Sequence, residues 1–594
     1  MTNTDILKED RVFRSLLPHL SKSDFHHFAL VNKTWNTAFQ PLIWRQLFLS
    51  SARFSTLFDN SDEYTKVILK NAAHIEHLQF RGCSNPATFL LFFSPCRNIQ
   101  RFSCHLKYEL PQDVFACLTI VEQNQGLDSF YLDGIPIKRL GVAQKFLQVL
   151  SQHTSLRHLV FESADSKISE HLFTAILQSI PPTLEFLDLK WSIEIQDDND
   201  FEYRDHHVTL PGWSNNGIKT IELNRALTGY EDSVVIPFLR HCVRLQSFRP
   251  PPSLSIECSP VLTQTLREHC PSLKRVLISN QDHDSAIAAV VNGSRTLEEF
   301  RIRYEGSVGS DLASSLVAQA AHLHTIEFEN GVFVHSADIQ TILSNCTGLR
   351  TFTVEDRQED GHESFLEIKD MVSSPWVCLG LQNLMLPMGS DYGVAGEQDV
   401  ESIRQLRQGV IIKAYKQFGA LKELRSLSFG LRVPLENSNQ FPLDSEGNQD
   451  FDMTLATGLD EMKDLKRLWR LEVSALRHRM REKELEWVDA NWPTLMYLGG
   501  IYMYEGEELS EDEEMYEDDE EEEDEQEEEE VEDLVDDVQD AIDSEGVAGD
   551  ESDDEGSERE AEQELEPEEP EPEGKLTRCH VAWFLERRPY AMLD

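Results

Sequence analysis

Histidine and cysteine are the residues of this chain whose types could support chemistry, either as metal ligands or as nucleophiles. Two histidine pairs, His26-His27 and His206-His207, are adjacent in sequence, and adjacent side chains on a helix or strand do not share a face. No two of the 10 cysteines have the Cys-x-x-Cys spacing of a zinc site. No phosphate-binding loop, HExxH or GxSxG motif occurs either. We therefore expect no catalytic residue, no metal and no cofactor, and the sequence does not predict an enzyme.

A repeated pattern of apolar residues runs through most of the chain and must position its polar side chains. The pattern is apolar-x-x-apolar-x-apolar; it begins at Ile75, Leu78 and Phe80 and recurs about fifteen times up to Leu495. Successive starts are 24 to 44 residues apart, with a median of 28. The last two apolar positions have the period of a strand, and segments such as 312–321 have the composition of a helix. One strand and one helix cannot bury their apolar faces alone, so neighbouring units must stack.

The stacked units predict an α/β solenoid over residues 60–504, with parallel strands on the concave face and helices on the convex face. The pattern resembles leucine-rich-repeat proteins of the ribonuclease-inhibitor type, which are horseshoes, and the degenerate repeats of fungal F-box proteins. The Asn or Cys that follows the strand in that family is mostly missing, since Cys83 fits but Ala226 and Glu305 do not. Three longer intervals are expected to hold loops or insertions: 191–217, 387–421 and 431–466.

Half of the cysteines occupy one position, three residues before the first apolar residue of a repeat: Cys96, Cys242, Cys270, Cys346 and Cys378. We interpret this position as a small buried side chain where a helix turns into a strand, rather than as redox or metal chemistry. The sequence shows neither a secretory signal nor an apolar run long enough to cross a membrane. We therefore expect a cytoplasmic or nuclear protein, without membrane association, whose cysteines are reduced.

Side chains that alternate with the buried positions of each strand are predicted to face the concave surface. Several of them are aromatic or arginine, the residue types that dominate protein–protein hot spots. We predict that this face binds a protein substrate through Tyr131, Arg157, Phe186, Arg275, Arg301, Arg350 and Trp469. For each residue taken singly, an ordinary solvated sheet surface is the alternative.

Residues 5–48 have a different pattern, which predicts three short helices before the solenoid. Apolar residues recur at helical spacing in residues 12–20 and 25–39, and Pro41 starts a third element. The run from Leu16 to Leu47 resembles an F-box, with its Val-x-x-x-Trp and later Trp-x-x-Leu. The resemblance implies that a Skp-type adaptor, itself linked to a cullin, binds Leu16, Leu20, Phe25, Val31, Trp35 and Trp44. Alternatively, these helices only cap the end of the solenoid.

Charge is distributed unevenly along the chain, whose formal net charge is −52. Residues 505–573 contain 41 of the 106 acidic residues and a single basic one, Arg559. This composition predicts a disordered acidic segment, and its field argues against nucleic acid as a partner. Residues 575–594 regain apolar side chains, and we expect this segment to pack back on the end of the solenoid.

Together these patterns favour a substrate-recognition subunit of a Skp–cullin–F-box-type ubiquitin ligase, which acts as a monomer within a hetero-complex. Two other functions stay open. A leucine-rich solenoid followed by an acidic run resembles the activators of Ran-type GTPases, so the chain could regulate a GTPase. The acidic segment could also make the chain a chaperone for basic proteins such as histones, and high salt would then abolish the binding.

Overall fold

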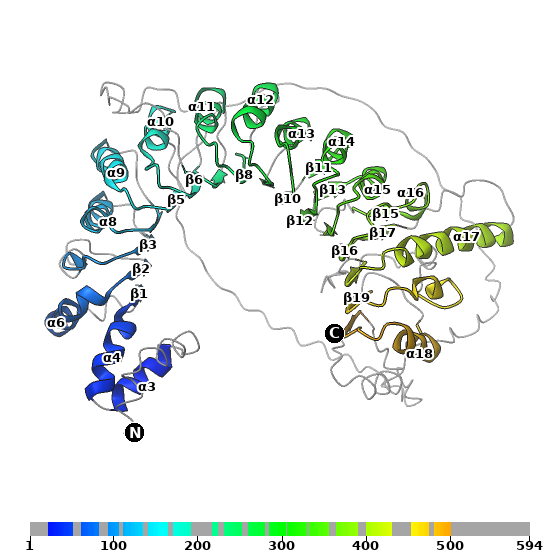
Figure 1. Cartoon of the computed structure of the whole chain (residues 1–594), viewed down its shortest axis with the longest axis horizontal. Coiled ribbons are helices and arrows are strands. Elements are labelled where there is room, and N and C mark those ends of the chain that lie inside the picture. The colour runs from blue at the N-terminus through cyan, green and yellow to red at the C-terminus, as the bar shows by residue number, and fades with distance from the viewer. Residues whose placement is uncertain are drawn as a thin grey trace, which may run out of the picture.

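The computed structural model alternates strands and helices along a single curved arc, with the strands inside and the helices outside (Figure 1). The predicted acidic segment 505–573, the C-terminal segment 575–594 and the first predicted helix lie outside the described residues. The structure describes residues 22–500 apart from residue 32 and the stretches 51–60, 82–92, 106–110, 135–139, 164–169, 192–216, 224–230, 252–258, 280–283, 304–305, 330–331, 356–363, 390–399, 430–452 and 474–479.

Sixteen strands form one parallel sheet in sequence order, and this sheet lines the concave side of the arc. Two additional pairs of short parallel strands, β11 (Gly306–Val308) with β13 (Val332–Val334) and β15 (Leu366–Glu367) with β17 (Met388–Gly389), lie beside it. The sixteen are β1 (Gln46–Ser50), β2 (His77–Arg81), β3 (Arg101–His105), β4 (Ser129–Asp133), β5 (His158–Ser163), β6 (Phe186–Trp191), β7 (Thr220–Leu223), β8 (Ser247–Arg249), β9 (Arg275–Ser279), β10 (Glu299–Arg303), β12 (Thr325–Glu329), β14 (Thr351–Val354), β16 (Asn383–Met385), β18 (Ser426–Ser428), β19 (Arg470–Glu472) and β20 (Tyr497–Gly499).

Helices cover the convex side, and each buries one apolar stripe against the back of the sheet (Figure 1). In α13, for example, Ile287, Val290 and Val291 recur at helical spacing and are all buried. The described helices of the convex side are α6 (Ser61–Asn71), α8 (Pro111–Gln123), α9 (Leu140–Gln152), α10 (Glu170–Ser179), α11 (Ile236–Leu239), α12 (Ser259–His269), α13 (Asp284–Gly293), α14 (Ser310–Ala318), α15 (Ser336–Asn345), α16 (Ile368–Met371), α17 (Val400–Gly419) and α18 (Glu482–Asn491), with single turns at η2 (Ala72–His74), η4 (Glu231–Val235) and η6 (Leu459–Met462).

The register of the sheet aligns the apolar positions of successive repeats into continuous rows. Leu78 pairs with Phe102 and Phe102 with Phe130, so the same repeat position stacks from strand to strand. The rings of Phe102 and Phe130 lie 5.9 Å apart in the core. A slip of one residue would move the apolar side chains of a strand from the buried face to the exposed face, so burial of these rows fixes the strand pairing. The predicted solenoid, with strands concave and helices convex, is confirmed.

The sheet starts earlier than residue 60, because β1 takes the place of a first repeat. Trp44, Leu47 and Leu49 occupy its three apolar positions, and all three contribute to the core or pack against it. The carbonyl of Arg45 accepts the N–H groups of Glu76 (3.1 Å) and the following residue (2.8 Å), the pattern that joins the later strands. The first repeat therefore begins within residues 5–48, the range predicted to hold three short helices, and ends just beyond it.

In most repeats a buried side chain lies three residues before the repeat start, where the chain turns from helix into strand. The N–H of Leu273, for example, donates to the carbonyl of Cys270 (3.1 Å), which closes the turn. The five cysteines at this position are buried and are not in disulfides, as expected for a packing role. Other repeats fill the same buried position with polar side chains: Asn124, His153 and Ser294.

Two of the helices that the structure describes precede the sheet, α3 (Lys22–Val31) and α4 (Lys33–Trp44), and they pack side by side at the N-terminal end of the arc (Figure 1). Their contact is aromatic, since the ring of Phe28 lies 5.3 Å from those of both Trp35 and Phe39. A single residue, Arg45, separates α4 from β1, so this helical pair is joined directly to the solenoid.

Candidate protein-binding face

The seven predicted substrate-binding residues are spread along the concave face from β4 to β19, and all are exposed or half-buried. Tyr131 and Arg301 are in the middle of their strands, between two buried apolar residues. The structure does not bring the seven into one cluster. Phe186 and Arg275 begin β6 and β9, whereas three residues lie just before a strand: Arg157, Arg350 and Trp469.

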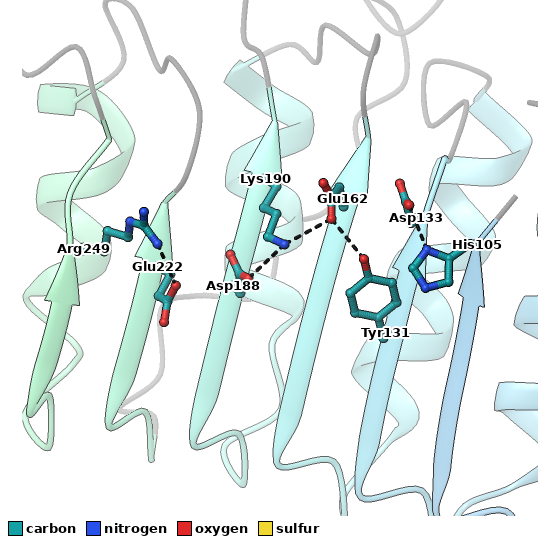
Figure 2. A network of polar contacts seen from close by, with 8 residues as sticks. All are labelled: His105, Tyr131, Asp133, Glu162, Asp188, Lys190, Glu222 and Arg249. Carbon is teal, nitrogen blue, oxygen red and sulfur yellow. Dashed lines mark hydrogen bonds and ion pairs between the residues drawn. The ribbon is translucent and has the colours of Figure 1, made fainter. Parts of the chain in front are cut away.

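Tyr131 belongs to a network of polar side chains on the N-terminal half of the face (Figure 2). Its hydroxyl donates to the carboxylate of Glu162 (3.0 Å), which also accepts from the ammonium of Lys190 (3.1 Å). The same ammonium is 3.8 Å from the carboxylate of Asp188. Burial, followed by the hydrogen bond to Glu162, raises the pKa of the Tyr131 phenol, so the phenol stays a proton donor at neutral pH.

Two further ion pairs flank this network on the neighbouring strands (Figure 2). The Nδ1 of His105 lies 3.0 Å from the carboxylate of Asp133. On the other side, the guanidinium of Arg249 contacts Glu222 (3.3 Å) and donates to the hydroxyl of Ser279 (2.7 Å). The N-terminal half of the face is therefore rich in charge, but its charges are bonded to one another.

Arg301 is similarly engaged at the centre of the sheet. Its guanidinium contacts Glu299 on its own strand (2.6 Å) and Glu327 on β12 (2.9 Å). Burial raises the pKa of the Glu327 carboxyl, an effect that Arg301 opposes. Next to this cluster, Arg303 pairs with Glu329 (2.5 Å). Sequence reasoning selected Arg301 and missed its acidic partners, although Glu299 occupies an alternating position of the same strand and Glu327 one of the next repeat.

A row of residues at the leading edge of the sheet continues without interruption over its last six repeats. Each carbonyl of this row accepts the N–H of the next, as between Arg350 and Gln382 (2.8 Å) and between Arg425 and Trp469 (2.8 Å). We call this row the C-terminal rim; it consists of His324, Arg350, Gln382, Arg425, Trp469 and Met496.

Directly beside the C-terminal rim, the last two strands carry an aromatic and charged cluster. The guanidinium of Arg470 lies 4.6 Å from the centre of the Tyr497 ring. The Tyr497 hydroxyl donates to the buried carboxylate of Glu472 (2.9 Å). This cluster holds β19 and β20 together at the end of the sheet.

The buried cysteines of the repeats are poorly suited to nucleophilic chemistry. Burial raises the thiol pKa of Cys96, Cys270, Cys346 and Cys378 to about 12, which makes these cysteines poor nucleophiles. In the same part of the chain, no three His, Cys, Asp or Glu side chains are grouped so that they could hold a metal ion. None of the helices that the structure describes is both long and apolar enough to span a membrane.

The predicted adaptor-binding residues divide into groups with different surroundings. Leu16 and Leu20 lie outside the described residues, and the side chain of Phe25 does as well. Val31 is 60% exposed on α3, next to Leu30, which is 82% exposed and was not singled out from the sequence. Trp35 packs within the helical pair, and Trp44 packs against the core of the solenoid.

Comparisons with known proteins find no family and only weak structural likenesses. No protein-family model matches the chain, and no curated protein matches it. Similar solved structures include the yeast Rad7 and Elc1 complex, with 12% identity, a TM-score of 0.32 and coverage of 84% of this chain and 92% of that chain. A Bacteroides fragilis protein has 12% identity and a TM-score of 0.29, covering 53% and 86% of the two chains.

A third similar structure is the Toll–Spatzle complex of Drosophila, with 12% identity, a TM-score of 0.30 and coverage of 60% of this chain and 47% of that chain. Likenesses this weak carry no conclusion about fold or function. The sheet and its repeat register place the chain among leucine-rich-repeat-like solenoid proteins.

Proposed function

We propose that this chain is the substrate-recognition subunit of a Skp–cullin–F-box-type ubiquitin ligase of the cytoplasm or nucleus. In this role α3 and α4 bind the Skp-type adaptor, and the concave face of the solenoid binds a protein substrate. The chain itself catalyses nothing. It increases the rate of ubiquitin transfer by holding the substrate near an enzyme bound elsewhere in the complex.

The observation that carries this proposal is an exposed apolar pair on α3. Leu30 and Val31 are 82% and 60% exposed, although both are aliphatic and lie at the end of a helix. Single exposed apolar residues are common, but two adjacent ones on a small helical pair favour a surface that a partner covers. Val31 also begins the Val-x-x-x-Trp pattern that resembles an F-box.

The join between the helical pair and the sheet supports the same role. Because Trp44 ends α4 and also packs against the solenoid core, the pair is not attached by a flexible linker. An adaptor bound to α3 would therefore keep a fixed distance from a substrate on the concave face. A fixed geometry is what proximity catalysis requires.

Co-purification with a Skp-type adaptor tests the proposal. We expect the double variant Leu30→Asp, Val31→Asp to lose at least about tenfold in adaptor affinity, because two charges would enter an apolar interface. The matched control is Val261→Asp, which places the same charge on a 44% exposed valine of α12, far from α3 along the arc.

Circular dichroism of the variants checks that the fold is intact. We expect an intact fold, because all three replaced side chains are exposed. If the double variant retains the adaptor as well as Val261→Asp does, or if the unaltered chain does not retain it, the proposed function is wrong.

A further inference from the structure

The charge pattern at the leading edge of the sheet, the row of residues just before the strands, differs between its two halves. In the first half, each of four cations is paired with an acid of the neighbouring repeat: Arg45 with Glu76 (2.8 Å), Arg157 with Asp128 (3.5 Å), Lys219 with Glu185 (2.7 Å) and Lys274 with Glu298 (2.7 Å). In the C-terminal rim this alternation ends. Among the described residues, Arg350 and Arg425 have no ion pair, and their neighbours in the row are uncharged or histidine.

At the end of the same row, the exposed side chains are apolar instead of charged. Trp469 and Met496 are 43% and 53% exposed, and they lie on adjacent strands, where the N–H of Met496 donates to the carbonyl of Trp469 (2.8 Å). Two large apolar side chains side by side next to a free arginine form the combination that dominates protein–protein hot spots. The C-terminal rim is thus both cationic and apolar.

The carboxylates close to the rim are already engaged. Glu472 is buried and accepts from Tyr497 (2.9 Å). Glu423 forms an ion pair with Arg467, and Asp464 lies 3.6 Å from the ammonium of Lys422. Within the part of the chain that the structure describes, the guanidinium groups of Arg350 and Arg425 therefore present uncompensated positive charge locally, on a chain whose net charge is −52. At physiological salt, charges more than ~8 Å away are largely screened, so the local charge decides what binds.

We propose that the C-terminal rim binds an acidic segment of the protein substrate, with the pattern acidic-x-x-acidic-x-apolar. This inference rests on the proposed function and adds the chemistry of the substrate to it. Neighbouring strands are about 4.8 Å apart, so Arg350 and Arg425, two strands apart, are separated by about 10 Å. An extended peptide covers that distance in about three residues, and about one or two more reach Trp469.

Arginine suits this task because its planar guanidinium can hold a carboxylate through two parallel hydrogen bonds. A nucleic acid fits the rim less well. Tight binding to a phosphate backbone uses many cations, typically about six to ten contacts, whereas the rim offers two unpaired ones. The methionine side chain at the end of the row also suits an apolar side chain better than a base.

Fluorescence anisotropy with the purified full-length chain and no adaptor tests the inference. The probe is a labelled synthetic peptide with Glu-Ser-Gly-Glu-Ser-Phe flanked by Gly-Ser, and the control peptide permutes the same residues so that both glutamates are adjacent. We expect saturable binding of the first peptide with a Kd on the order of 0.1 mM, at least about fivefold weaker binding of the second, and weakening of both at high salt.

Two sets of variants locate the binding. The pair Arg350→Gln, Arg425→Gln should weaken binding about tenfold, and Trp469→Ala should do so to a similar extent. The matched control is Arg81→Gln, Arg101→Gln, which removes two exposed arginines at the end of β2 and the start of β3, and it should change the affinity less than about twofold.

Several results would overturn the inference. One is the absence of saturable binding of the peptide to the full chain. This result would count against the inference if the rim lacks affinity for acidic segments, and equally if the chain's own residues 505–573 compete with the peptide. Another is equal loss in the control pair, and a third is preferential binding of a labelled twelve-nucleotide thymidine oligomer. Peptide binding that survives in Leu30→Asp, Val31→Asp, while adaptor binding is lost, would separate this inference from the proposed function.

Discussion

Asn124 shows how a single buried side chain links two repeats at the turn from helix to strand. Its side-chain oxygen accepts the N–H of Ile99 (2.9 Å), and its amide donates to the carbonyls of Cys96 (3.1 Å) and Ile120 (2.7 Å). Ser294 occupies the same repeat position and donates to the carbonyl of Leu273 (2.8 Å). A cysteine, an asparagine or a serine can therefore fill this position, because each is small and satisfies nearby backbone groups.

His153 fills the same position with a side chain that can titrate. Its Nε2 lies 2.9 Å from the carbonyl of Val121, and since a carbonyl only accepts, Nε2 carries the proton of a neutral ring. Its Nδ1 is buried without a hydrogen-bond partner in the described part of the chain. Burial lowers the pKa of His153 below its ordinary value, so protonation is disfavoured in the folded state.

We therefore predict that His153 makes the fold sensitive to acid. Below about pH 6.5 the unfolded chain takes up a proton at this residue that the folded chain does not, so stability falls as the pH decreases. The variant His153→Asn, which uses the solution found at Asn124, should lose less stability between pH 7.5 and 5.5. Urea midpoints at the two pH values measure the difference.

Exposed His171 on α10 provides the control, because His171→Asn should leave the pH dependence as it is in the unaltered chain. An identical acid-induced shift of the midpoint in His153→Asn and in the unaltered chain would show that burial of this ring does not contribute.

Among the elements, the strands of the solenoid were the most predictable. Each of the fifteen apolar patterns found in the sequence precedes or overlaps a strand of the single sheet, because three buried positions per repeat leave little freedom of register. The remaining strand, β1, which is the first of the sheet, was not predicted. Trp44-x-x-Leu47 satisfies the repeat pattern and also resembles the end of an F-box, and the sequence alone could not separate the two.

The candidate site was predictable only in part, for a geometric reason. Alternation along a strand correctly placed Tyr131, Arg301 and Trp469 among the exposed or half-buried residues. Their partners come from neighbouring repeats, as Glu162 does for Tyr131. Whether an exposed basic side chain is paired often depends on a residue of the neighbouring repeat, 24 positions away for Lys274 and 34 for Lys219, and on side-chain direction, which the repeat pattern does not specify.

At the level of elements, the position of Trp44 predicts that the helical pair and the first strand are coupled. Removing the indole in Trp44→Ala should destabilise the N-terminal end by about 2–4 kcal/mol, because a large side chain against the core is replaced by a cavity. Hydrogen exchange of the β1 amides should become faster, while the amides of β9 and β10 keep their protection.

Leu30→Asp, on the exposed surface of α3, serves as the comparison and should leave exchange in β1 unchanged. Unaltered protection of β1 in Trp44→Ala would mean that this tryptophan does not anchor the solenoid, and that its role is confined to a partner surface.

The whole molecule is a one-dimensional stack, in which each strand of the main sheet contacts only the strands before and after it. Its stability is then approximately a sum of repeat stabilities and of the interfaces between neighbours. Figure 1 places α3 and α4, the proposed adaptor-binding helices, at one end of the arc and β19, which follows Trp469 of the C-terminal rim, near the other. The two proposed binding surfaces should therefore be energetically separate, which lets each be altered without affecting the other.

Paired core substitutions at the two ends test this separation. Leu132 on β4 and Leu471 on β19 are both fully buried, and replacing either by alanine should cost about 3 kcal/mol locally. Because coupling passes only between neighbours, Leu471→Ala should accelerate hydrogen exchange in β18 to β20 and leave β2 to β5 protected, and Leu132→Ala should do the reverse. Uniformly faster exchange along the whole arc in either variant would instead show one cooperative unit. In that case a change at the C-terminal rim could reach the adaptor-binding helices through the fold itself.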